Sequence, residues 1–338
     1  MKRVIWLVLV AVILGLLGAP AAHAAEEQVA VYTALEEDEA KVYLDQLKKD
    51  DPALHAKVKW IRLSTGVLAS RIEAERANPQ ADVIWGTFND FITGLARKGL
   101  IEPYESPEAR ALAPGFKHPE KFWAASTVLN IALAVSTEQL KKANLPEPRS
   151  WEDLTKPAYK GQIVTANPST SGTAYLVVAG LLTKYGEEKG WDYLSRLDKN
   201  VSQYTKSGGA PGRMAAQGET AIGITFEFEI FRFAKKGHPV KTIFPEDGVP
   251  WTMEANALVK GAKNPQTARK FIDWALSKSA ARAYAEWRGW AGAVARTDVD
   301  MGHLPKAPGM ITPVNMDFTW AAENKDRIVK KWLSQFGR

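Results

Sequence analysis

Short apolar runs and amphipathic stretches alternate regularly along the first part of the chain. The runs predict strands, and the stretches between them, whose apolar positions repeat every three to four residues, predict helices. Strands are expected at Val29–Tyr32, Val58–Leu63 and Ala81–Trp85, and helices at Glu36–Lys49, Val67–Ala77 and Asn89–Lys98. This strand-helix order is typical of a parallel sheet covered by helices.

A proline-rich segment then leads to a long β-rich stretch, Phe122–Val135, which we interpret as a crossing into a second unit. Beyond it, strands are expected at Gln162–Thr165, Ala221–Thr225, Val240–Phe244 and Glu254–Val259, and helices at Gly172–Tyr185, Glu187–Leu197 and from Asn264 past Tyr284. We therefore expect one unit to be inserted in the other. The predicted boundaries are residues 25–132 plus 240–286 for the first lobe and 133–239 plus 287–338 for the second.

The first 24 residues have the pattern of a cleaved secretory signal. Met1-Lys2-Arg3 is followed by an apolar run, Val4–Leu17, that is too short to span a bilayer comfortably, and by the small-x-small site Ala22-His23-Ala24. The chain has no cysteine, so the signal cannot direct a lipid anchor. We expect a free protein of the periplasm that begins near Ala25.

Composition narrows the possible functions. The 338 residues are 46% hydrophobic and 24% charged, which is typical of a soluble protein of about two domains. The absence of cysteine excludes disulfides, thiol nucleophiles and thiolate zinc sites. Loss of Lys2 and Arg3 lowers the net charge from +6 to +4, and the remaining bases are scattered. We therefore expect no nucleic-acid partner.

Hydroxyl side chains follow the carboxyl ends of several predicted strands, where ligands bind in open α/β sheets. They are Thr33, Ser64, Thr65 and, in the densest group, Ser169, Thr170, Ser171 and Thr173 around Gly172. Hydroxyls and free amides at helix starts bind oxyanions. Serine and threonine are also the preferred helix caps, so each position has a purely structural alternative. Taken together, the group predicts an anion site.

Glutamates and aromatic residues lie near the same strand ends. The glutamates of the segment Thr225–Glu229, directly after a predicted strand, are candidates to receive an ammonium group or to ligate a cation. Glu227 is the first candidate for the ammonium group, and Glu36, at the start of the first helix, is the second. The alternative is that both are first-turn charges that complement the helix dipole. Trp85 and Tyr204 are candidates for the walls of a cleft.

Catalytic motifs are not evident. The four histidines beyond residue 24 are isolated, and neither His-Glu-x-x-His nor Gly-x-Ser-x-Gly occurs. We therefore assign no catalytic residue, metal ligand or cofactor, and keep a secreted phosphoesterase only as an alternative from another class.

Several segments, in this order, resemble bacterial solute-binding proteins of ABC importers, in the branch with ferric-ion, hexose-phosphate and 2-aminoethylphosphonate binders. They are Val29–Ala34, Ala81–Trp85, Trp151–Leu154, Tyr159–Gly161, Pro168–Tyr175, Ala221–Ile224 and Asn264–Trp274. The resemblance implies a monomeric, two-lobed periplasmic binding protein fold of type II. Each lobe would be a mostly parallel sheet flanked by helices, with a ligand cleft between the lobes and delivery to a membrane permease.

The resemblance also suggests the ligand. Ferric binders of this branch have adjacent tyrosines after the strand at Ala221–Thr225, where this chain has Phe226-Glu227-Phe228-Glu229. The segment from Ser169 to Thr173 is similar to the one that phosphonate and sugar-phosphate binders use for the tetrahedral anion. We therefore expect a small organophosphorus anion, with 2-aminoethylphosphonate first and hexose phosphate or ferric ion as alternatives.

Overall fold

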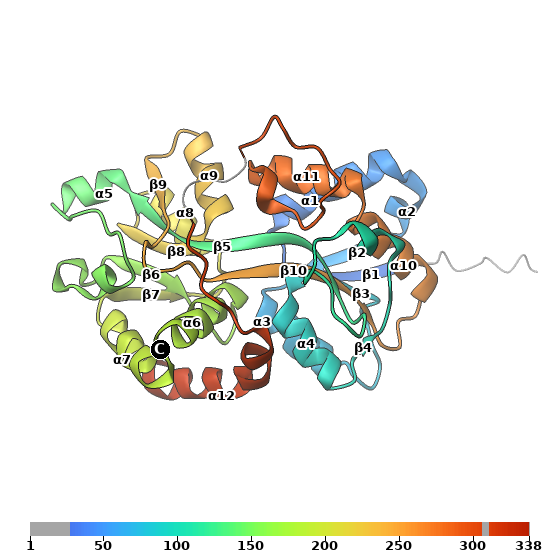
Figure 1. Cartoon of the computed structure of the whole chain (residues 1–338), viewed down its shortest axis with the longest axis horizontal. Coiled ribbons are helices and arrows are strands. Elements are labelled where there is room, and N and C mark those ends of the chain that lie inside the picture. Colours follow the sequence, from blue (N-terminus) through green and yellow to red (C-terminus); the bar gives the residue numbers. More distant parts are fainter. Residues whose placement is uncertain (1–27, 306–310, 338) are drawn as a thin grey trace, which may run out of the picture.

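The computed structural model describes residues 28–305 and 311–337, so the predicted signal peptide lies outside the described residues. Two lobes lie side by side and are joined by two long strands, β5 (Ala124–Ser136) and β10 (Trp251–Val259) (Figure 1). Both strands are almost wholly buried.

Within the described residues, ten strands form the sheet. The remaining strands are β1 (Val29–Thr33), β2 (Val58–Arg62), β3 (Val83–Phe88), β4 (Ile101–Glu102), β6 (Ile163–Ala166), β7 (Val201–Thr205), β8 (Ile222–Phe226) and β9 (Val240–Ile243). Their order is β2-β1-β3-β10-β5-β8-β6-β7, with β4 on β10 and β9 on β5. β1 is parallel to β2 and β3, and β6 is parallel to β7 and β8, as predicted for each lobe.

β5 changes partner halfway along its length. Residues 124–130 pair with β10, whereas residues 131–135 pair with β8. The predicted crossing strand is thereby confirmed. We call the part built on β1 to β4, β10 and residues 124–130 the first lobe, and the part built on β6 to β9 and residues 131–136 the second lobe.

Helices flank both lobes. In the first lobe they are α1 (Glu37–Asp50), α2 (Pro52–Lys57), α3 (Thr65–Ala74), α4 (Asn89–Arg97), α10 (Pro265–Ala275) and α11 (Lys278–Arg288). In the second they are α5 (Thr137–Lys142), α6 (Gly172–Tyr185), α7 (Glu187–Asp198), α8 (Ala210–Ala216) and α9 (Glu227–Lys235). α12 (Phe318–Phe336) packs against both α4 and α6. Within the described ranges, no helix has the length and apolar character needed to cross a membrane.

Two predicted helices differ from those observed. α3 begins at Thr65, two residues earlier than expected, because Ser64 rather than a later residue is the N-cap. The long helix expected from Asn264 is divided at Leu276 and Ser277, where the Ser277 hydroxyl accepts the amide of Ala280 and starts α11. A side-chain cap therefore explains the start of α11, whereas the Ser64 side chain makes no capping hydrogen bond at the start of α3.

The strand pairing also corrects the predicted lobe boundaries. Residues 240–243, predicted in the first lobe, form β9 and pair with residues 133–136 of the second. Val294 forms a bridge with Thr127 and Arg296 with Leu112, which places these residues against the first lobe instead of the second. Such long-range pairings leave no signal in the local apolar pattern.

Trp85 lies in the core of the first lobe. Every residue of β3 is buried, and the Trp85 ring packs edge-to-face against Phe271 with centroids 5.4 Å apart. Its indole N–H donates to the Tyr284 hydroxyl at 3.3 Å. Trp85 is therefore a core residue and does not line the cleft, contrary to the sequence-based expectation.

Candidate functional site

A cavity lies between the lobes, at the carboxyl ends of β1, β2, β3 and β8. It is lined by the start of α1, the first turns of α3, α6 and α9, and the loop before α8. The cavity is small, about 30 Å³, which is room for two or three water molecules. Six of the predicted ligand-binding residues line it: Glu36, Ser64, Thr65, Ser171, Gly172 and Thr173.

Arg62 supplies a positive charge at the cavity. Its Nη2 donates to Glu36 at 2.8 Å and to the Ser207 hydroxyl of the second lobe at 3.2 Å, while Nη1 donates to the Ser64 hydroxyl at 3.0 Å. The Nε atom is buried and has no hydrogen-bond partner. An unpaired buried N–H is costly, so this atom can donate to a bound acceptor.

Two helix N-termini from different lobes meet at the same cavity. α3 begins at Thr65 in the first lobe, and α6 begins at Gly172 in the second. First-turn amides have no acceptor within their own helix, and the helix dipole is positive there. The Ser171 hydroxyl caps α6 by accepting the amide of Ala174 at 3.3 Å, and its hydrogen can still be donated to a ligand.

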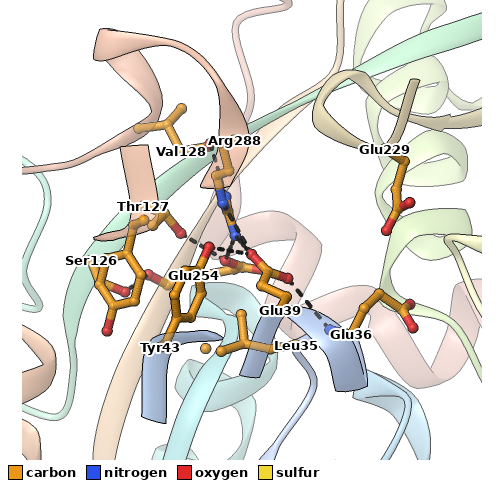
Figure 2. Close-up of polar contacts among 12 residues, drawn as sticks. Leu35, Glu36, Glu39, Tyr43, Ser126, Thr127, Val128, Glu229, Glu254 and Arg288 are labelled. Carbon is orange, nitrogen blue, oxygen red and sulfur yellow. Dashed lines mark hydrogen bonds and ion pairs between the residues drawn. The ribbon is translucent and has the colours of Figure 1, made fainter. Parts of the chain in front are cut away.

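Carboxylates from both lobes also line the cavity. Glu36, Glu39 and Glu254 come from the first lobe and Glu229 from the second. Figure 2 shows Glu36 and Glu229 facing each other. A Cβ atom at Gly209 would lie 3.1 Å from the Oε1 atom of Glu36 and 3.3 Å from that of Glu229. The missing side chain at position 209 therefore leaves room for both carboxylates.

A buried ion triad holds two of these carboxylates (Figure 2). The Arg288 side chain, which is fully buried, donates to Glu39 at 2.9 Å and also to Glu254. Glu39 further accepts from the Tyr43 hydroxyl at 2.7 Å, and Glu254 from that of Thr127 at 2.7 Å. Burial raises the pKa of Glu254, while Arg288 lowers it. The triad thus fixes two carboxylates at the cavity with one compensating cation.

Glu229 is less firmly held. Its two oxygens lie 3.3 and 3.4 Å from Nη1 of Arg232, long for a charge-assisted hydrogen bond. Burial raises its pKa to about 8, although Arg232 lowers it. At neutral pH the carboxyl group therefore holds a proton and can both donate and accept a hydrogen bond.

Glu227, the predicted ammonium partner, lies in the interior instead. It is fully buried, and its carboxylate accepts the backbone amide of Asn130 at 2.8 Å and the Asn130 side-chain amide at 3.3 Å. Asn130 lies in β5 where that strand leaves the first lobe. Glu227 thus fastens α9 to the crossing strand, and Glu229 faces the cavity in its place.

Four other predicted site residues also lie away from the cavity. Thr33 is buried and accepts the amide of Leu35, and Ser169 donates to Asn167. The Thr170 hydroxyl donates to the carbonyls of Asn167 and Lys206. Tyr204 donates to Asp198, and its ring packs against that of Trp332. Local turns and the packing of α12 hold these side chains.

The sequence carried signals for three residues that were missed. Arg62 lies two residues before the N-cap Ser64, at the end of an edge strand with alternating exposure. Glu254 is the one charged residue in the stretch Trp251–Val259. Glu229 is two residues from Glu227 in the first turn of α9, and only the packing of that helix decides which one faces the cavity. Among residues 28–305 and 311–337, no group of three or more histidines or acidic residues is arranged to hold a metal ion.

Comparisons with known proteins identify the family. Residues 78–315 match the family described as bacterial extracellular solute-binding protein. An uncharacterized protein of Haemophilus influenzae is 34% identical over 82% of this chain and 83% of its own length. The probable ABC transporter periplasmic-binding protein y4fP of Sinorhizobium fredii is 30% identical, over 68% of this chain and 64% of its own.

Two further proteins have ligands in their names. The putative 2-aminoethylphosphonate-binding periplasmic protein of Salmonella typhimurium is 24% identical over 81% of each chain. The periplasmic binding protein AfuA from Actinobacillus pleuropneumoniae, whose structure has fructose 6-phosphate bound, is 31% identical to this chain in sequence. It superposes with a TM-score of 0.84 and covers 91% of this chain and 98% of AfuA. The chain therefore belongs to the bacterial extracellular solute-binding proteins, which bind their ligands and are not enzymes, and it has the fold of periplasmic binding proteins.

Proposed function

We propose that the protein is the periplasmic component of an ABC importer, that it binds a small organophosphorus anion, and that it delivers this anion to a membrane permease. The predicted signal peptide and the probable ABC transporter relative support this location and partner. The predicted phosphoesterase alternative is set aside because the family is not enzymatic.

One observation carries the anion assignment: Arg62 and the first turns of α3 and α6 converge on one cavity from two lobes. An arginine with a spare N–H, together with first-turn amides, matches the acceptors of a phosphoryl or phosphonyl group. Ser64 and Ser171 add hydroxyl donors without adding charge.

The carboxylates indicate the chemistry of the part of the ligand that lies beyond the anionic group. Glu36, Glu39, Glu229 and Glu254 together offer more acceptor than donor atoms, which favours a ligand tail that is rich in hydrogen-bond donors. Sugar hydroxyls can satisfy several such acceptors at once, whereas an ammonium group is a single charged donor. We therefore place a hexose phosphate first, a choice that the likeness to AfuA supports.

2-Aminoethylphosphonate is the second candidate. Glu229 from the second lobe, loosely held by Arg232, could receive the ammonium group that the sequence analysis assigned to Glu227. The Salmonella relative supports this ligand at lower identity. Ferric ion is the weakest candidate, because the chain lacks the adjacent tyrosine pair of the ferric-ion binders that it resembles.

A melting experiment tests these proposals. The ligand-stripped mature protein is heated with fructose 6-phosphate, glucose 6-phosphate, 2-aminoethylphosphonate, phosphate or ferric citrate. A compound that binds only the folded state raises the melting temperature, by an amount set by its affinity and concentration. A shift with the hexose phosphates supports the first candidate, and a shift with aminoethylphosphonate alone supports the second. A shift with ferric citrate alone would contradict both.

A further inference from the structure

Arg232 in α9 makes contacts in both lobes. Its Nη1 lies 3.3 Å from Glu229 in the same helix, and its Nη2 forms an ion pair with Asp38 in the first turn of α1. The guanidinium carbon lies 4.2 Å from the ring centroid of Trp287 in α11. The Arg232 side chain is only 11% exposed. One side chain of the second lobe is therefore held by two elements of the first.

The guanidinium group suits this arrangement. Its central carbon lies over the Trp287 ring while separate N–H groups reach Glu229 and Asp38. A lysine ammonium is a compact point charge and lacks the planar fork. The contacts at position 232 therefore require a guanidinium group, whereas an exposed ion pair could be made by lysine as well.

Glu229 connects this contact to the cavity. The carboxyl group lines the cavity between Glu36 and the loop at Gly209, and it is 5% exposed. Arg232 is the only residue for which the described structure gives a hydrogen bond to it. Any ligand group that fixes Glu229 therefore also fixes the guanidinium group that reaches across to the first lobe.

We propose that Arg232 is a positioning residue through which a ligand in contact with Glu229 holds the two lobes together. The inference rests on the proposed function, because it requires the ligand to touch Glu229. Coupling of this kind is reciprocal: the ligand stabilises the contact across the lobes, and this contact strengthens ligand binding.

Dissociation kinetics test the proposal. Fructose 6-phosphate is released from the wild type and from R232Q, R232K and D38N in stopped-flow fluorescence experiments. We expect release to be about 5- to 50-fold faster in R232Q, intermediate in R232K and about 2- to 5-fold faster in D38N. Association should change less than release, because Arg232 acts through Glu229 and does not itself line the cavity. A merely structural role would lower the melting temperature without this selective effect on release.

R196Q is the matched control. Arg196 pairs with Glu152 and Asp192 within the second lobe, away from the cavity. Its removal should leave the release rate unchanged. Equal release rates for R232Q, D38N and the wild type would overturn the proposal. If R232Q fails to fold, the release rate of D38N tests the proposal. The Asp38 side chain is 57% exposed, so its replacement should not disturb folding, and it leaves Arg232 in place.

A second measurement does not depend on the ligand. Because the chain has no cysteine, K48C and K160C place spin labels on exposed sites of the first and second lobes. We expect R232Q to add longer distances to the distribution between the labels, and R196Q to leave it unchanged. An unchanged distance distribution in R232Q would refute the proposed role of Arg232 in holding the two lobes together. If no compound of the melting panel binds the wild type, the proposed function fails while this measurement still decides the role of Arg232.

Discussion

Replacing Gly66 with alanine should prop the lobes apart. Gly66 lies in the first turn of α3, and its amide donates to the Thr170 carbonyl of the second lobe at 3.3 Å. A Cβ atom at this position would lie 2.7 Å from the Ser169 carbonyl oxygen. That oxygen belongs to the backbone and cannot rotate away. An ordinary contact begins at 3.4 Å, so the lobes must separate by about 0.7 Å at this edge.

The expected cost follows from the clash. Overpacking of this kind destabilises by about 1–3 kcal/mol, which corresponds to roughly 5- to 150-fold weaker ligand binding if the bound state requires the contact. Within the first lobe the same change should not destabilise α3, because alanine is a better helix former than glycine. G66A is therefore expected to bind more weakly without melting at a lower temperature when unliganded.

G94A provides the control. Gly94 lies in α4, and an added Cβ there would meet nothing within 4 Å. It places alanine in a helix as G66A does, but without the clash. Titration calorimetry with the compound that raises the melting temperature compares the two. If G66A binds as tightly as G94A, the lobes of the liganded protein do not approach through Gly66, and the reasoning is wrong.

Three further outcomes are expected. R62Q should weaken fructose 6-phosphate binding by about 1.5–3 kcal/mol in calorimetry, because a charged donor is lost; unchanged affinity would remove Arg62 from the site. E229Q should reduce binding of 2-aminoethylphosphonate more than of ethylphosphonate if Glu229 receives the amine, and equal losses would refute that role. Burial raises the pKa of Asp90 to about 6, of Glu227 to about 7 and of Glu229 to about 8. The folded state thus holds these protons more tightly than the unfolded chain, so the free energy of unfolding should fall from pH 5 to pH 8 in denaturant titrations. The lowered pKa of His118 acts in the opposite sense, and a rise over this range would contradict the prediction.

The fold could be predicted because its information is local. Apolar runs marked the buried strands, and the long stretch that became β5 had too many consecutive apolar residues for a half-exposed strand. The site was only partly predictable, since it depends on how two lobes meet. Glu227 and Glu229 are both in the first turn of α9, yet one fastens β5 and the other faces the cavity. Trp85 was predicted to line the cleft because it lies at a strand end, as the hydroxyl residues do. It lies in the core instead, because every residue of β3 is buried.

A ligand that enters the cavity competes with hydrogen bonds that already join the two lobes. Ser207 of the second lobe donates to Glu36 at 2.9 Å and accepts from Arg62 at 3.2 Å, where the anion is proposed to bind. A ligand that binds there must take over Arg62 from Ser207 and Glu36. Its affinity then reflects the difference between its own bonds to both lobes and the bonds it replaces, so selectivity depends on the donors that reach Glu36 and Glu229 after Arg62 has turned to the anion.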